Sequence, residues 1–180
     1  MAEKQYESMN PVFIALGANL GKPQATFAAA LASLTRAGVR VEATSDLWTS
    51  PAWPPGSDAP DYTNAVARVA THLAPQDLLD LLLHVEATHG RTRSAPNASR
   101  TLDLDLLAYG GRVVNTPRLT LPHPRMSARA FVLLPLWQIA PDWVHPVTEQ
   151  GIDTLVGALP SVDGLACLRP PEANGGSHTP

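Results

Sequence analysis

The first third of the chain moves from a strand-like to a helix-like hydrophobic pattern and back. Val12 to Leu16 is a continuous apolar run that ends at Gly17, which is typical of a central strand buried on both faces. Pro23 is suited to the first turn of a helix, and apolar residues then recur at helical spacing until Gly38. These patterns predict a strand over 12–16, a helix over 23–37 and, from the alternation that follows, a strand over 39–47.

A similar succession follows a loop that we expect over residues 48–60, where four prolines, two tryptophans and a glycine disfavour regular structure. Beyond it the pattern predicts a strand over 62–71, a helix from Pro75 to the residue before Gly90, a second loop over 90–99 and a strand over 102–109. Gly110-Gly111 is a hairpin turn signal, so residues 112–114 are expected to return beside that strand.

The last third of the chain is less regular. Ser127 is suited to the N-cap of a helix over 127–139, which Pro135 is expected to interrupt. Residues 166–180, which end in proline, glycine and small polar residues, are expected to form a disordered tail. The remaining residues, 1–165, are expected to form a single domain.

The predicted order is strand, helix, strand, strand, helix, strand, which is the split β-α-β pattern. We therefore expect a ferredoxin-like α+β fold: an antiparallel sheet with its helices packed on one face, plus extra C-terminal elements. Because this fold supports many functions, the function has to be argued from particular side chains.

Composition and charge narrow the class of protein. Cys167 is the single cysteine and cannot form an internal disulfide, which fits a reducing cytoplasm. The chain shows neither the apolar core of a signal peptide nor an apolar run of membrane-spanning length, so we expect a soluble cytoplasmic protein, most simply a monomer, with no membrane partner. The formal net charge of −3 argues against a general nucleic-acid binder.

The charge is reversed locally between Arg91 and Arg129, where seven arginines face only two carboxylates, Asp103 and Asp105, for a local excess of +5. Strand alternation over 102–106 places both aspartates on one face and the leucines on the other. Residues two apart are separated by roughly 6.5 to 7 Å along a strand, so the two carboxylates can converge on a pair of metal ions. Carboxylates of this kind, completed by substrate phosphates, suit Mg²⁺.

The arginines support this interpretation but leave an alternative open. Arg91 and Arg93 in the preceding loop, and Arg100 just before the strand, carry guanidinium groups suited to phosphate oxygens. They could instead only pair with the two aspartates or cover the sheet face. The aspartates could likewise be the ordinary solvent-facing side of an edge strand.

Five separated segments resemble, in order and spacing, the 6-hydroxymethyl-7,8-dihydropterin pyrophosphokinase family. The stretch Arg100-Thr101-Leu102-Asp103-Leu104-Asp105-Leu106-Leu107 is similar to its signature, and the others are Ala15 to Leu20, Tyr62 to Ala65, Leu119 to Met126 and Arg129 to Leu133. The similarity covers roughly residues 12 to 146. It implies transfer of pyrophosphate from ATP to the pterin hydroxymethyl group in folate biosynthesis, with ATP and the pterin as small-molecule partners.

The resemblance also assigns roles on the nucleotide side. It implies that Asp103 and Asp105 hold two Mg²⁺ ions, and that Arg91 and Arg100 contribute to catalysis. Its further ATP-binding residues are Glu86, Arg93, Leu106, His123 and Arg129.

The pterin side is assigned in the same way. Asn64 matches a residue that hydrogen-bonds the ring, and Tyr62 and Phe131 match aromatic residues that border it, although by themselves these two would be read as core residues. The remaining implied pterin contacts come from the first loop, at Ser50, Pro51 and Trp53.

The chain departs from the family pattern at three places. Asn97-Ala98-Ser99-Arg100 stands where the family commonly has Trp-Gly-Pro-Arg, so the loop tryptophan is absent. Leu83 stands in place of a frequent glutamine, and Pro124 in place of a tyrosine.

Two other functions remain open at this point. A two-metal phosphohydrolase or nucleotidyltransferase could use the same aspartates, and a ferredoxin-like sheet could bind single-stranded nucleic acid. The pterin residues argue against the first, and the lack of an aromatic-rich, glycine-containing strand motif argues against the second.

Overall fold

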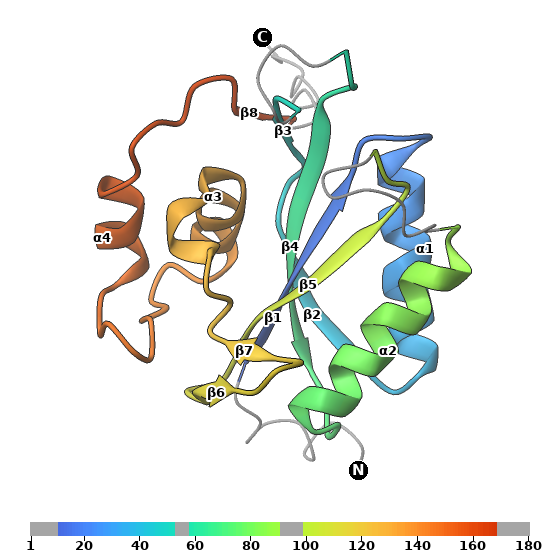
Figure 1. The fold of residues 1–180 in the computed structure, drawn as a ribbon, viewed down its shortest axis with the longest axis horizontal. Coiled ribbons are helices and arrows are strands. Elements are labelled where there is room, and N and C mark those ends of the chain that lie inside the picture. The colour runs from blue at the N-terminus through green and yellow to red at the C-terminus, as the bar shows by residue number, and fades with distance from the viewer. Residues whose placement is uncertain (1–10, 53–57, 91–98, 169–180) are drawn as a thin grey trace, which may run out of the picture.

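The computed structural model describes residues 11–52, 58–90 and 99–168, which form a twisted antiparallel sheet with helices on both sides (Figure 1). In chain order, the elements that build the first two thirds are β1 (Val12–Ala18), α1 (Pro23–Arg36), β2 (Arg40–Thr44), β3 (Trp48–Ser50), β4 (Tyr62–Ala70), α2 (Pro75–Thr88) and β5 (Asp103–Tyr109). The later elements are β6 (Val114–Asn115), β7 (Thr120–Leu121), a 3-10 turn (Met126–Ala128), α3 (Ala130–Ile139), α4 (Ile152–Gly157) and β8 (Ala166–Cys167).

The main sheet has the order β5-β1-β4-β3-β8, and β2 also pairs with β4. All of these pairings are antiparallel, and β1 lies between β4 and β5. This is the arrangement that the split β-α-β pattern requires, so the predicted ferredoxin-like α+β fold is confirmed.

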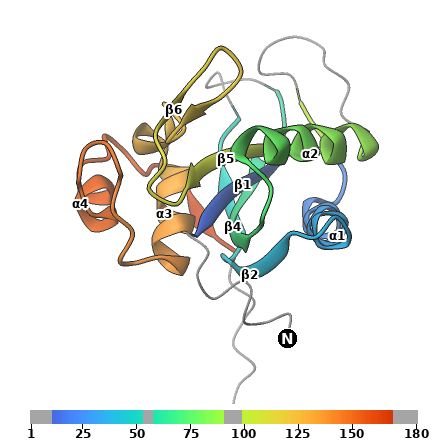
Figure 2. The ribbon, with the colours of Figure 1, turned by 90° about the horizontal axis from the view of Figure 1, so that it is seen from below.

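The two faces of the sheet pack against different helices (Figure 2). Alternate residues of β1, such as Ile14 and Leu16, pack with the apolar sides of α1 and α2 in the first core cluster. Phe13 and Val66, on the opposite face, pack with residues of α3 and α4. The prediction of helices on one face is therefore confirmed for α1 and α2, the helices of the split β-α-β unit, and the apolar residues of α3, a C-terminal addition, bury the second face of the sheet.

The helices that pack on the first face agree closely with the predicted ranges, whereas α3 does not. It begins at Ala130, and Arg129, not Ser127, is its N-cap. Pro135 stays inside this helix and is buried. Pro135 is the sixth of the ten residues of α3 and lacks the N–H that would donate to the carbonyl of Phe131, and burial of its ring offsets this loss and keeps the helix intact.

The hairpin predicted after Gly110 is also wrong, since β6 pairs with β7 and not with β5. A strand of two residues has too little side-chain alternation to specify its partner. The β6–β7 hairpin instead lies near the outer edge of β5, where the backbone N–H of His123 donates to the carbonyl of Leu107 at 2.8 Å.

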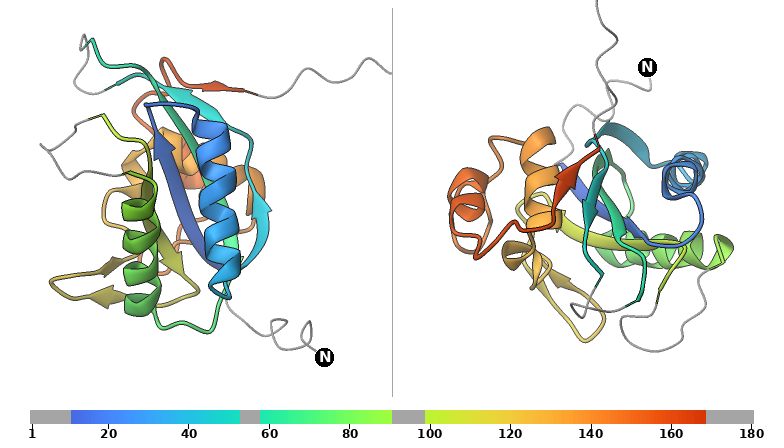
Figure 3. Two further views of the ribbon diagram at one scale, coloured as in Figure 1. Left: turned by 90° about the vertical axis from the view of Figure 1, so that its right-hand side faces the viewer. Right: turned by 90° about the horizontal axis from the view of Figure 1, so that it is seen from above.

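Strand pairing includes residues 48–50 and 166–167, which the sequence pattern places in a loop and in the tail. Residues 48–50, expected in a loop, form β3, and the strand expected over 39–47 ends at Thr44. Ser45 separates the two because its Oγ, in place of a backbone oxygen, accepts the backbone N–H of Val66 at 2.9 Å. The sheet runs past the expected boundary at 165, since β8 pairs with β3 (Figure 3). Residues 169–180 of the expected tail lie outside the described residues.

Candidate active site

Strand β5 presents its two aspartates on the face opposite its buried leucines. Leu104 and Leu106 are only 3% exposed and pack against α1 and α2. The side chains of Asp103 and Asp105 are 25% and 41% exposed on the other face. The alternation predicted for residues 102–106 is therefore confirmed, and both carboxylates are accessible from one side of the sheet.

Asp103 is one of three residues that lie in a row across three neighbouring strands. Gly17 on β1 pairs with Asn64 on β4 and with Asp103 on β5. A β-carbon at Gly17 would lie 3.7 Å from Asn64 Oδ1 and 3.8 Å from Asp103 Cβ, so the missing side chain leaves an open stretch of sheet between them. A flat ring could lie over this glycine and reach both neighbours.

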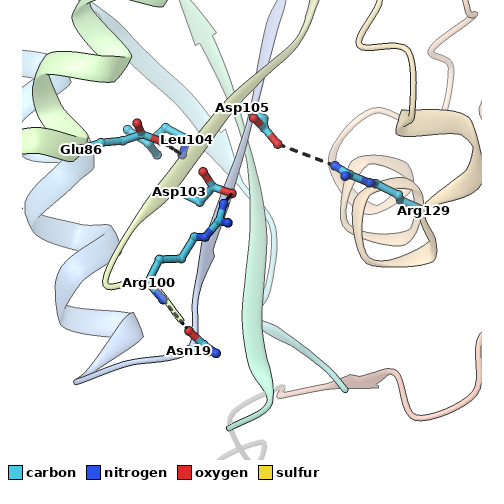
Figure 4. Close-up of polar contacts among 7 residues, drawn as sticks. All are labelled: Asn19, Glu86, Arg100, Asp103, Leu104, Asp105 and Arg129. Carbon is cyan, nitrogen blue, oxygen red and sulfur yellow. Dashed lines mark hydrogen bonds and ion pairs between the residues drawn. The ribbon is translucent and has the colours of Figure 1, made fainter. Parts of the chain in front are cut away.

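Two arginines contact the two carboxylates, one from each side (Figure 4). An Arg100 guanidinium nitrogen lies 2.6 Å from Asp103 Oδ2, and one of Arg129 lies 3.7 Å from Asp105 Oδ2. Burial opposes the charge of Arg100, but the Asp103 carboxylate outweighs it with smaller contributions from Tyr62 and Asp105, so the pKa of Arg100 is raised. Both arginines remain cationic at neutral pH, because the pKa of an arginine side chain stays far above neutral pH even where its surroundings lower it.

Arg129 also connects the aspartates to the start of α3. Its guanidinium lies 5.5 Å from the centre of the Phe131 ring, within the range of a cation–π interaction. Burial lowers the pKa of His123, and Arg129 and Arg125 act in the same direction against the opposing effect of Asp105. His123 is therefore a neutral hydrogen-bond donor or acceptor near the positive charges of Arg125 and Arg129.

Glu86 approaches β5 from the other side, on α2 (Figure 4). It is 2% exposed, and its Oε1 accepts the backbone N–H of Leu104 at 2.7 Å. Since Leu104 N–H faces the outer edge of β5, strand alternation turns the backbone N–H and C=O of Leu106 toward the same edge. Glu86 thus covers the peptide between the two aspartates and leaves the neighbouring part of this edge beside it.

A groove of about 310 Å³ follows this edge between α2 and the β6–β7 hairpin. Its lining includes Glu86, both aspartates, Leu106 and His123, so five predicted site residues from separate segments meet around one space. Leu83 and Pro124, two of the positions that depart from the family pattern, line it too. A larger groove of about 620 Å³ lies between α1 and α2, but none of the predicted site residues lines it.

Ser50, Asn64 and Tyr62 of the predicted pterin side lie on neighbouring strands. Asn64 is 5% exposed, and its Nδ2 donates to Ser50 Oγ at 2.9 Å, while Ser50 pairs in register with Tyr62. Pro51 is exposed and packs toward Gly164, where a β-carbon would lie 2.5 Å from the Pro51 ring. Arg91, Arg93 and Trp53 lie outside the described residues.

Sequence reasoning assigned no role to two residues that the structure places at the centre of this region. The sequence pattern gives Gly17 only as the end of a strand, and Asn19 only as one residue of the segment Ala15 to Leu20. Asn19 is 5% exposed and its Oδ1 accepts the backbone N–H of Arg100 at 2.8 Å. The polar Asn19 directly after a buried strand was the available signal, since such a side chain must find partners if it is buried.

The donor set here fits magnesium. Asp103 and Asp105 supply hard carboxylate oxygens on one exposed face, and Mg²⁺ is commonly bound through one or two carboxylates together with substrate phosphates and water. Arg100 and Arg129 add positive charge beside them. The same surface can therefore accept a polyanion that brings oxygen ligands of its own.

Comparison with known proteins decides the family. The model of the family described as 7,8-dihydro-6-hydroxymethylpterin-pyrophosphokinase matches residues 13–141. This chain belongs to that family. It is 46% identical over 132 residues to the 2-amino-4-hydroxy-6-hydroxymethyldihydropteridine pyrophosphokinase of Pseudomonas aeruginosa, which covers 73% of this chain and 81% of the relative. The enzyme of the same name from Haemophilus influenzae is 42% identical over 142 residues, or 78% and 88% of the two chains.

Solved structures agree on the fold of the pyrophosphokinase family. The Plasmodium falciparum HPPK-DHPS with pteroate superposes with a TM-score of 0.67 at 13% identity, over 83% of this chain. This chain spans 42% of that longer protein. Within the residues that the structure describes, no helix has the length and apolar character needed to cross a membrane.

Proposed function

We propose that this chain carries out the pyrophosphoryl transfer of its family at the face formed by Asp103, Asp105 and Gly17. The reaction moves the β- and γ-phosphoryl groups of ATP together onto the hydroxymethyl oxygen of 6-hydroxymethyl-7,8-dihydropterin and serves folate biosynthesis. The observation that carries the proposal is the position of the two carboxylates. They lie between an edge groove on one side and the open Gly17–Asn64 surface on the other.

The nucleotide is proposed to occupy the edge groove. Leu106 offers backbone donor and acceptor groups to a flat base, and His123 lines the same space. From there the triphosphate extends toward Arg100 and Arg129, whose guanidinium groups suit phosphate oxygens. Arg91 and Arg93, which lie outside the described residues, are proposed to add further phosphate contacts.

The groups predicted for the acceptor are proposed to hold the pterin over Gly17. The hydrogen bond from Asn64 Nδ2 to Ser50 orients the amide, so that Oδ1 faces Gly17 and can accept a ring N–H. Tyr62, at the start of β4, and Phe131, in the first turn of α3, are proposed to border the ring. Pro51 and Trp53 stay predictions as further pterin contacts from the first loop.

Two Mg²⁺ ions held by Asp103 and Asp105 would neutralise phosphate charge and align an in-line displacement. The bond between the hydroxymethyl oxygen and the β-phosphorus forms while the bond from the β-phosphorus to the oxygen of the α-phosphate breaks. AMP leaves with that electron pair, and the hydroxyl proton is released. Arg100 and Arg129 stabilise the charge that develops on the phosphates, since they are already held beside the reacting groups.

Product analysis tests this function directly. The protein is incubated with ATP and Mg²⁺, with and without 6-hydroxymethyl-7,8-dihydropterin, and the nucleotides and pterins are separated. AMP and the pterin diphosphate are expected in equal amounts and only when the pterin is present. Release of ADP or phosphate at the same rate without the pterin would instead indicate a phosphohydrolase that uses the same aspartates.

A further inference from the structure

The buried side chain of Asn19 joins two segments that the strand ladders do not reach. The pairing of β1 with β4 ends at Ala18, opposite Thr63, and its pairing with β5 ends at Gly17, opposite Asp103. Asn19 is the next residue along the chain. Beyond these ends, the chain segments that lead into β4 and β5 are not paired with β1, and other contacts must hold them together.

Asn19 makes four hydrogen bonds across this gap. Its Oδ1 accepts the backbone N–H of Arg100 at 2.8 Å, and its own backbone N–H donates to the carbonyl of Arg100 at 3.1 Å. Its Nδ2 donates to the carbonyl of Pro60 and to Ser99 Oγ, both at 3.2 Å. One amide that is 5% exposed thus uses both its donor and its acceptor groups on segments far apart in the sequence.

These partners stand next to residues of both substrate sides. Pro60 lies two residues before Tyr62, which begins β4 on the proposed pterin side. Arg100 carries the guanidinium that lies 2.6 Å from Asp103 Oδ2. Tyr62 also contributes to the raised pKa of Arg100, so the segments that lead into β4 and β5 lie near each other in space.

We propose that Asn19 is a positioning residue that holds Arg100 in place relative to Asp103 and to the start of β4. This inference rests on the proposed function. Asn19 touches neither substrate in this scheme and acts only through its neighbours. Small displacements of a positioned group strongly reduce the reaction rate. Removal of the Asn19 side chain should therefore lower turnover strongly in a protein that still folds.

The test compares Asn19→Ala with a matched control, Tyr109→Phe. The Tyr109 hydroxyl donates to the carbonyl of Leu73 at 2.7 Å, so Tyr109→Phe also removes a side-chain bond that ties β5 to a distant segment, but away from the site. With saturating substrates, Asn19→Ala is expected to lower kcat about 10- to 100-fold. Tyr109→Phe should leave kcat within about twofold. Equal losses in the two variants would mean that Asn19 only stabilises the fold.

A double-mutant cycle tests the route of the effect. In an Arg100→Ala background, Asn19→Ala should cost less than about threefold in kcat, because the group that it positions is already gone. The same loss in both backgrounds would overturn the proposal. Faster hydrogen exchange of the Arg100 amide in Asn19→Ala is expected as well, and unchanged exchange would also count against it.

Two further comparisons keep the outcomes separable. If Asn19→Ala does not fold, Asn19→Asp replaces it, since aspartate keeps an acceptor for the Arg100 N–H but loses the donor to Pro60; wild-type kcat in that variant would contradict a role for the Pro60 bond. A wild-type protein without pterin-dependent AMP formation would refute the proposed function, whereas an active wild type with an unaffected Asn19→Ala would refute only this inference.

Discussion

Asn64 and Asp103 face each other across a single glycine. They lie on strands β4 and β5, which flank β1, and both are in register with Gly17. The residue predicted to read the pterin ring and the residue predicted to hold a metal ion are therefore separated by the width of one strand. This closeness connects acceptor binding with phosphate chemistry.

Asp103→Asn and Asp105→Asn should each lower product formation by at least about 100-fold, because each removes a charged oxygen ligand from a preorganised site. Both side chains are partly exposed, so the variants should stay folded. Initial rates and thermal melting are measured on the same samples. Asp142→Asn, at an exposed position after α3, is the control. Near wild-type activity of either site variant would exclude a metal-binding role for that aspartate.

Gly17→Ala and Gly17→Leu should differ sharply. An added β-carbon meets only ordinary contacts at 3.7 and 3.8 Å, so Gly17→Ala should fold and keep measurable activity. A leucine would project over the surface between Asn64 and Asp103 and weaken pterin binding tenfold or more, which is about 1.4 kcal/mol. Calorimetric titration with the pterin and an ATP analogue checks this. Unchanged pterin affinity in a folded Gly17→Leu would place the pterin elsewhere.

Asn64→Ala and Phe131→Ala should weaken pterin binding while ATP-analogue binding measured without pterin stays nearly unchanged. Loss of a buried hydrogen bond or a stacked ring is expected to cost about 1 kcal/mol, or roughly fivefold in affinity. Thr49→Ala, on β3 beside Ser50, is the control. Equal weakening of both ligands would show that the site had collapsed. The Phe131 ring also contacts Arg129, so ATP-analogue binding has to be measured for Phe131→Ala in particular.

Arg100→Ala should lower the rate of the chemical step more than it lowers ATP affinity, since a contact that strengthens in the transition state mainly affects turnover. A loss of 2 to 4 kcal/mol corresponds to about 30- to 1000-fold in turnover. The same is expected for Arg91→Ala. Single-turnover quench rates are compared with equilibrium ATP titrations. Full recovery of activity at saturating ATP would show that the arginine only holds nucleotide.

His145 should make stability depend on pH. Burial lowers its pKa below the usual value of about 6.5, and its Nδ1 accepts the backbone N–H groups of Val147 and Thr148. The unfolded chain therefore takes up a proton first as the pH falls, so stability present above about pH 6.5 is lost as the pH falls toward and through the lowered pKa. Between pH 8 and pH 5 the melting temperature should fall less steeply for His145→Gln than for the wild type. Identical slopes of melting temperature against pH would contradict this role of His145.

Local patterns predicted much of this molecule because they depend on neighbouring residues. The spacing of apolar residues located both helices of the split β-α-β unit, and alternation placed the two aspartates of β5 on one face. The failures share a cause as well. The partner of β6 and the helical continuity through Pro135 depend on what packs against them, which local sequence does not contain.

The sequence by itself determined the helices and main strands of the split β-α-β unit, the Asp103 and Asp105 pair and the resemblance that named the residues around it. Only the tertiary structure decided that Gly17 separates Asn64 from Asp103, that Glu86 covers the peptide of Leu104, and that Asn19 joins Pro60 to Arg100. Each of these relationships joins segments far apart in the chain. They are set by strand register and by the need of buried polar groups for partners, and both are settled only when the whole sheet has formed.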